Sequence, residues 1–202
     1  MALAVAIERR SGGLDQDRAA WWGDSRHGVF ALADGAGGTS GGAGAAMRVL
    51  REARALHRGL HRSPLEALDA VDAALSRSGG QSTAILVELR EGVLRGASTG
   101  DSRAWLIGGN LIELTRSQRR RPLLGDGGLP VPFGPVALRG RLLLASDGLF
   151  DYVDLRAIAR TAVGGELASC ARALTALPRF ADGTFPDDVV VLLAEATPTA
   201  SR

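Results

Sequence analysis

Hydrophobic and polar positions along the 202-residue chain change repeatedly between strand-like and helix-like spacing, which predicts a mixed fold. Short runs of Val, Leu, Ile and Ala bounded by Gly, Asp or Pro are typical of strands. The expected strands are residues 2–8, 28–33, 82–90, 93–99, 102–107, 110–114, 136–138, 141–146 and 188–195. Apolar residues three and four positions apart predict helices instead. The expected helices are residues 41–60, 64–76, 154–163 and 165–177.

The order of these elements indicates the fold class. A pair of helices follows the first strands, a β meander comes next, and a second helix pair precedes the last strand. Short turns between consecutive strands favour antiparallel pairing. We therefore expect an α+β protein, a four-layer α-β-β-α sandwich of two mainly antiparallel sheets covered by helix pairs. A Pro/Gly-rich loop is expected over 117–135, and no linker divides the chain, so residues 1–202 are predicted to form a single domain.

Composition limits the partners and the location of the protein. The net charge is only +2, and arginine supplies all the basic charge because the chain has no lysine. The basic run at 119–121 is more typical of a solvated loop than of a nucleic-acid site, so no nucleic-acid partner is expected. Cys170 is the single cysteine and lies in an apolar helical stretch, which indicates a small buried side chain. Residues 2–8 are too short for a membrane span and lack a signal-like basic start, so we expect a cytoplasmic protein without membrane contact.

Aspartates stand where hydrophobic runs meet turns. Asp34, Asp101 and Asp147 each follow a predicted strand, Asp187 begins the last one, and Asp17 lies in the segment GLDQD. An Asp-Gly pair after a strand is a strong turn signal, and for Asp34 or Asp147 taken alone a turn is the simpler interpretation. Antiparallel pairing would gather the four strand-end acids at one edge of a sheet. Since hard divalent cations prefer oxygen ligands, the set predicts a metal site.

A glycine-rich segment offers a different kind of site. Residues 35–41 follow a strand and precede a helix, as in a dinucleotide-binding turn. The glycine spacing is imperfect, and the helix leads into a second helix instead of a parallel strand with a ribose-binding acid. A Walker-type loop is excluded because the chain has no lysine. A nucleotide site is therefore the less favoured interpretation.

The acids lie within blocks that follow a fixed order along the chain. These blocks are GLDQD (13–17), VFALADGAGG (29–38), GGQSTAILVEL (79–89), GVLRGASTGDSRAWLI (92–107) with LIELT (111–115), RLLLASDGLFDYV (141–153) and DDVVVLLAE (187–195). The series resembles the metal-dependent Ser/Thr protein phosphatases of type 2C, in a compact bacterial form, from about Ser11 to Glu195. The resemblance implies that a hydroxide bridging two Mn²⁺ or Mg²⁺ ions hydrolyses phosphoserine and phosphothreonine in proteins. The implied partner is a phosphorylated protein, so the enzyme would oppose a Ser/Thr kinase.

The resemblance also assigns roles to individual residues. The implied metal ligands are Asp17, Asp34, the Gly35 carbonyl, Asp101, Asp147 and Asp187. Asp34 would bridge the two metals, and Asp34, Asp147 and Asp187 would act in catalysis through the metal-bound water. Asp101 resembles the residue that holds a third metal in several members, and its alternative role is a turn aspartate with Arg103 as a structural partner. Asp188 is the less favoured ligand, because adjacent residues on an extended chain point opposite ways.

The chain also departs from the family pattern near the predicted substrate site. Gly12 stands where an arginine commonly binds the substrate phosphate, and Arg10 and Arg18 are the candidate replacements. Ala36 stands where some members have a histidine proposed as general acid. Leaving-group protonation would then fall to a metal-bound water or another group, and His27, the nearest histidine in sequence, is more typical of an incidental loop residue.

The segment between Thr115 and Arg141 is shorter than is usual in the family, and two functions are therefore considered for the chain. Between Thr115 and Arg141 the family usually has a longer excursion with a mobile flap, so this chain is expected to have a reduced flap and an open site. The first hypothesis is an active phosphatase, including the variant in which the substrate is a regulatory-switch protein, as in sporulation-type relatives. The alternative is a phosphatase-like binding or regulatory module with little turnover.

Overall fold

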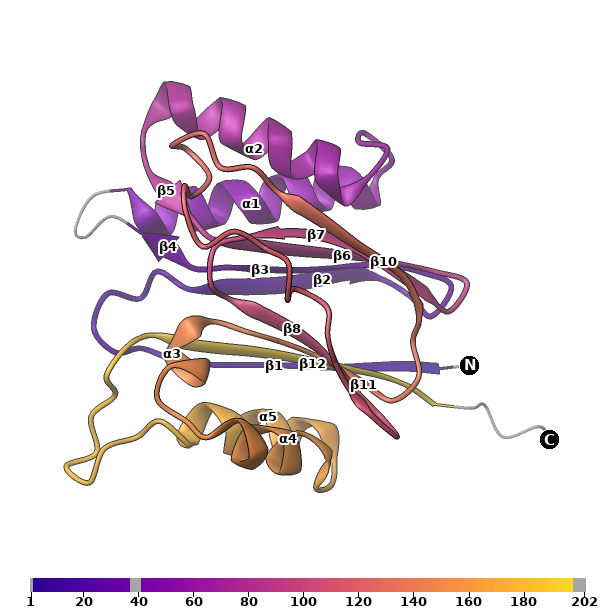
Figure 1. Ribbon diagram of the computed structural model, residues 1–202, viewed down its shortest axis with the longest axis vertical. Helices are drawn as coiled ribbons and strands as arrows, with labels where there is room; N and C mark the ends of the chain where they lie inside the picture. Colours follow the sequence, from indigo (N-terminus) through magenta and orange to yellow (C-terminus); the bar gives the residue numbers. More distant parts are fainter. Residues whose placement is uncertain (1, 37–40, 198–202) are drawn as a thin grey trace.

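The computed structural model describes residues 2–36 and 41–197, and its main strands form two stacked five-stranded sheets (Figure 1). The first sheet has the order β1 (Ala2–Arg10), β12 (Val189–Thr197), β11 (Arg141–Ala145), β8 (Arg103–Ile107) and β9 (Leu111–Glu113). The second has the order β10 (Val131–Ala137), β7 (Val93–Thr99), β6 (Ala84–Arg90), β3 (His27–Ala33) and β2 (Arg18–Gly23). A short ribbon joins β4 (Gly35–Ala36) to β5 (Gln81–Ser82).

Helices cover the outer face of each sheet (Figure 1). They are α1 (Gly42–His57), α2 (Pro64–Ser78), α3 (Asp147–Phe150), α4 (Leu155–Val163) and α5 (Leu167–Ala176). Helix α1 packs on β3 and α2 on β6 and β7, while α5 packs on β1 and β12 with α4 beside it. Every ladder between the named strands is antiparallel. The predicted four-layer α+β sandwich is therefore confirmed.

The central strands are apolar on both faces because each face meets a different layer. In β3, Val29, Ala31 and Ala33 pack against α1 and α2, whereas Phe30 and Leu32 pack between the sheets. The side chains of β12 alternate in the same way: one set packs between the sheets, and the other packs in the core under α4 and α5. Side chains alternate along a strand, so a continuous apolar run serves two cores at once. This double burial fixes how far each strand extends before its polar end residue.

Apart from the short strands β4 and β5, two strands differ most from the sequence prediction. Strand β2 (Arg18–Gly23) was not predicted, because this half-buried edge strand lacks apolar alternation. Strand β10 (Val131–Ala137) begins inside the predicted 117–135 loop, so that prediction is wrong over residues 131–135. Proline is tolerated at a sheet edge, and the register of β10 shifts between Phe133 and Val136. A Cβ at Gly96 would lie 2.2 Å from the Phe133 ring, so the glycine makes room for this strand.

The helix starts follow the expected local chemistry. The Ser63 side chain accepts a hydrogen bond from the Glu66 N–H at 3.2 Å, which confirms it as the cap of α2. Helix α3, a single turn that begins at Asp147, was not predicted. Within the described ranges, no helix is both long and apolar enough to cross a membrane.

Leu142 tests the inter-sheet core. It is fully buried between the two sheets, so Leu142→Ala is expected to lower the free energy of unfolding by about 2–5 kcal/mol. Leu111→Ala is the matched control: Leu111 is 45% exposed on β9, and its loss is expected to change stability by less than about 0.5 kcal/mol. Urea denaturation of both variants measures the difference, and equal losses would contradict this description of the core.

Candidate metal centre

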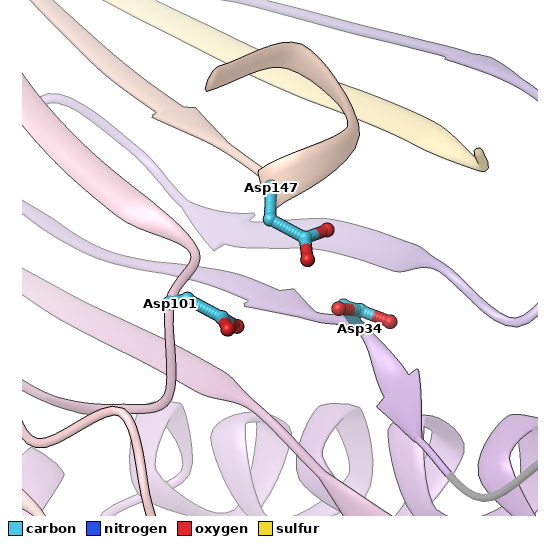
Figure 2. Close-up of side chains that lie close together, drawn as sticks. All are labelled: Asp34, Asp101 and Asp147. Carbon is cyan, nitrogen blue, oxygen red and sulfur yellow. The ribbon is translucent and has the colours of Figure 1, made fainter. Parts of the chain in front are cut away.

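Asp34, Asp101 and Asp147 point toward a shared space (Figure 2). Each offers a carboxylate oxygen within 4.8 Å of the other two. Asp34 follows β3 of one sheet, Asp147 follows β11 of the other, and Asp101 lies in the turn from β7 to β8 that connects them. The expectation of a single sheet edge is therefore wrong. The acids gather at one end of the sandwich, where strands of both sheets finish.

Hydroxyl side chains fix the backbone around Asp34. The Asp34 carbonyl accepts from the Thr83 N–H at 2.9 Å and from the Ser82 hydroxyl at 2.9 Å, and the Asp34 N–H donates to the Thr83 hydroxyl at 3.2 Å. The same Thr83 hydroxyl lies 2.9 Å from the Ser102 hydroxyl, beside Asp101. Sequence reasoning missed these positioning residues. The available signal was a run of small polar residues directly before an apolar strand.

Asp17 brings a fourth carboxylate to the site. It is only 4% exposed, its carboxyl group hydrogen-bonds the Ser146 hydroxyl and the Asp34 carboxyl group, and its Oδ2 atom is buried without a hydrogen-bond partner. Burial raises the pKa of Asp17 to about 7, although the Ser146 hydrogen bond opposes the shift. A buried oxygen without a donor is a group that a cation satisfies. This donor set of carboxylates therefore fits a hard divalent metal.

Burial and mutual repulsion act on the other acids as well. Burial, then the charge of Asp17, raises the pKa of Asp34 to about 8, and Asp101 and Asp187 add to the shift. Burial, then the charge of Asp34, raises the pKa of Asp147 to about 7. Asp187 is exposed and lies outside the group of three, but its charge acts on both Asp34 and Asp147. Its assignment as a ligand stays a prediction.

Asp188 holds the segment that precedes Asp17. Its carboxylate accepts hydrogen bonds from the Ser11 hydroxyl at 3.0 Å, the Gly12 N–H at 2.7 Å and the Gln16 N–H at 2.6 Å. Burial alone would raise the pKa of Asp188, but these donors together lower it. Asp188 is therefore committed to the 11–16 segment, and the open neighbour Asp187 keeps its place as the predicted ligand.

The two candidate phosphate-binding arginines, Arg10 and Arg18, donate hydrogen bonds to backbone carbonyls. The Arg18 guanidinium donates to the Asp15 and Asp17 carbonyls at 2.9 and 2.8 Å, and that of Arg10 donates to a neighbouring carbonyl at 3.1 Å. Within the described residues, neither forms an ion pair with the three clustered acids. At Gly12, an added Cβ would lie 2.2 Å from the carbonyl carbon of Asp187. The close backbone approach explains why this position has no side chain.

The remaining sequence candidates lie apart from the acids or outside the described residues. His27 begins β3 and Asp34 follows its end, so they lie roughly 20 Å apart at about 3.3 Å per residue. The His27 Nε2 atom instead lies 3.4 Å from the Glu88 carboxylate. Cys170 is buried, as its surroundings in the sequence predicted. Of the glycine-rich alternative, residues 37–40 lie outside the described residues, so that interpretation stays untested.

The expected structural partner of Asp101 is different in the structure. The Arg103 guanidinium lies 5.1 Å from the centre of the Phe150 ring, and the described ion pair of Asp101 is with Arg120, at 3.4 Å. Sequence reasoning placed Arg120 in a solvated run. Only the folded loop brings it to the acids.

No family model and no curated protein matches the chain, so its relatives come from solved structures. The Ser/Thr phosphatase PstP of Mycobacterium tuberculosis is 25% identical, with a TM-score of 0.79 over 98% of this chain and 100% of that one. The PstP catalytic domain with two manganese ions is 24% identical, with a TM-score of 0.80 over 98% and 99%. Stp1 of Staphylococcus aureus is 20% identical, with a TM-score of 0.78 over 97% and 96%.

The fold is that of the bacterial type 2C Ser/Thr phosphatases. The resemblance indicated by the sequence blocks is thus confirmed by structures that match nearly the whole chain. In the type 2C sandwich of this chain, the ends of the two sheets bring together acids that lie more than 100 positions apart in sequence. Identification of each acid as a ligand rests on the geometry and stays a prediction.

The raised pKa of Asp34 gives the metal-free protein a defined pH dependence. A carboxyl whose pKa is higher in the folded state binds more protons there, so stability falls as pH rises from about 4 through the folded pKa of about 8. With chelator at pH 8, Asp34→Asn should therefore be more stable than the wild type by up to roughly 5 kcal/mol, since the pKa rises from 3.8 to about 8 and each unit corresponds to about 1.4 kcal/mol.

Thermal unfolding with chelator from pH 5 to 8.5 measures this effect. Asp126→Asn is the matched control, because Asp126 is an exposed loop residue away from the cluster. Parallel pH profiles for wild type and Asp34→Asn would show that Asp34 carries no electrostatic strain.

Proposed function

We propose that the protein is a metal-dependent phosphatase that removes phosphate from phosphoserine and phosphothreonine in proteins. The observation that carries the proposal is the convergence of Asp34, Asp101 and Asp147, beside the buried Asp17, in a fold whose solved relatives are Ser/Thr phosphatases. One of these relatives contains two manganese ions. The acids here fit the same class of ion.

The proposed ligands divide between two ions. Asp34 would contribute to holding both ions, the Gly35 carbonyl, Asp147 and Asp187 would hold one of them, and Asp17 would hold the other. When bound, two Mn²⁺ or Mg²⁺ ions would supply a water that ionises near neutral pH and positive charge against the phosphoryl oxygens.

The protein's own contribution is to fix these oxygens in place before the substrate arrives. Thr83 and Ser82 hold the Asp34 backbone, and Ser146 holds the Asp17 carboxyl group. Asp101 is the proposed ligand of a third, looser ion. Fixed carboxylates give the reacting groups a set geometry, which is where much of the rate gain in phosphoryl transfer arises.

The surroundings of the acids suit a phosphorylated protein segment. A cavity of about 250 Å³ opens beside Asp101 and is lined by Arg103, Arg116 and Arg120 as well as acidic and polar side chains. Arginine side chains recognise phosphate through planar, charge-assisted hydrogen bonds. The substrate is thus proposed to be a phosphoprotein that a Ser/Thr kinase produces. A cytoplasmic location stays a prediction.

A binding or regulatory module with little turnover is the second candidate. It is favoured by Gly12, whose backbone approach to Asp187 leaves no room for an arginine, and by Ala36 in place of a proton donor. Such a module would bind metal and phosphopeptide and release no phosphate.

Metal-dependent turnover separates the two candidates. With Mn²⁺, the wild type should release phosphate from a phosphothreonine peptide and from p-nitrophenyl phosphate, and chelator should abolish the reaction. Asp34→Asn should lower kcat by about 100-fold or more, beyond the roughly 10–100-fold loss typical of outer-shell partners of a metal. Asp126→Asn should retain wild-type activity. Binding of manganese and phosphopeptide without phosphate release would favour the module.

A further inference from the structure

The basic run at 119–121 is held beside Asp101 by hydrogen bonds of Arg119 and of the preceding residue, Gln118. The Gly100 N–H donates to the Arg119 carbonyl at 2.9 Å, and the Gln118 amide donates to the Ser102 carbonyl at 2.6 Å. Gly100 and Ser102, which take part in these two bonds, flank Asp101 in the sequence. One main-chain bond and one side-chain bond of the loop therefore place Arg120 beside Asp101.

The same loop is anchored further along. Leu124 and Ser82 exchange backbone hydrogen bonds at 3.2 Å, and the Asp72 carboxylate of α2 accepts from the N–H groups of Gly125 and Gly128 at 2.8 and 3.2 Å. Ser82 also holds the Asp34 backbone through its hydroxyl. The reduced flap predicted from the sequence is thus a loop that hydrogen bonds join to α2 and to Ser82, which positions Asp34.

Arg120 presents a charged group at the mouth of the cluster. Its Nη2 atom lies 3.4 Å from Asp101 Oδ2 and 3.8 Å from Asp151 Oδ2, and its side chain is 65% exposed. These are long, open contacts, which contribute little stability. The guanidinium group carries five donors in a planar fork, so contacts of this kind leave donors available to a ligand. Arg103 and Arg116 line the same cavity and add positive charge.

The other arginines considered do not occupy this place. In the described part of the chain, Arg120 is the arginine that forms an ion pair with a member of the Asp34, Asp101 and Asp147 group. Arg18 lines a separate cavity with residues of β1, and the backbone of Gly12 lies too close to Asp187 for any side chain.

We propose that Arg120 binds the phosphoryl group of the substrate, and inorganic phosphate as product, beside the metal centre. The inference rests on the proposed function. A phosphate dianion can accept two charge-assisted hydrogen bonds that are shorter than the 3.4 Å contact with Asp101. The Arg120 guanidinium group would therefore exchange Asp101 for phosphate as its anionic partner. Arg120 thereby supplies from the loop the contact that Gly12 does not provide.

Phosphate affinity tests the proposal apart from turnover. The variants are Arg120→Ala, Arg120→Lys and, as a control of equal charge change in the same run, Arg119→Ala, which keeps the main-chain carbonyl bond. In Arg120→Ala, the KM for p-nitrophenyl phosphate and the inhibition constant of inorganic phosphate should both rise about tenfold, the size expected for one lost charge-assisted bond. In Arg120→Lys, both constants should lie between those of the wild type and those of Arg120→Ala. In Arg119→Ala, both should equal the wild-type values.

Two further measurements make the outcome decisive. Calorimetric titration should show unchanged Mn²⁺ affinity in Arg120→Ala, and thermal unfolding should be unchanged. An unaltered inhibition constant, a rise seen instead in Arg18→Ala, or a loss of Mn²⁺ binding in Arg120→Ala would each overturn the proposal. If the wild type shows no turnover, titration of inorganic phosphate into the manganese-loaded protein decides the same question. An Arg120-dependent affinity there would retain this inference while the proposed function fails.

Discussion

Repulsion among buried carboxylates is the constraint on which the rest of this structure depends. Burial and neighbouring charges raise the pKa values of Asp17, Asp34 and Asp147 together. Carboxylates removed from water and left without partners destabilise a fold, whereas a bound cation reverses that effect. The two sheets and their helices supply the stability that such a cluster needs, with apolar cores on both faces of each sheet. The acids therefore form a cluster whose mutual repulsion a bound divalent cation would offset.

The fold creates this cluster by ending strands of two sheets at the same place. Ser146 shows the connection most directly: its oxygen accepts from the Val190 N–H at 3.0 Å within one sheet, and its hydroxyl hydrogen-bonds Asp17, which directly precedes β2 of the other. Asp188, which directly precedes β12, likewise accepts hydrogen bonds from residues of the 11–16 segment. Small polar side chains and backbone groups thus set the relative positions of the acids, and the Oδ2 atom of Asp17 is left buried without a hydrogen-bond partner.

Local chemistry made much of the fold predictable. The continuous apolar runs, the Ser63 cap and the aspartates at strand ends could all be read from the sequence, because each depends on neighbours along the chain. Strand β2 could not be predicted, since its pairing partner decides its conformation. Nor could the division of the acids between two sheets, which depends on strand order. Arg120 was assigned to a solvated run because only long-range hydrogen bonds place it at the site: the Arg119 carbonyl accepts from Gly100, and the Gln118 side chain donates to Ser102.

We expect these carboxylates to lose protons when they bind divalent metal. Titration calorimetry of Mn²⁺ at pH 6.5, in two buffers with different ionisation enthalpies, tests this expectation most directly, because the raised pKa values require proton release on binding. The account predicts binding of two ions, with a heat that differs between the buffers and an affinity that increases at pH 8. Absence of Mn²⁺ binding, or binding with equal heats in both buffers, would contradict it.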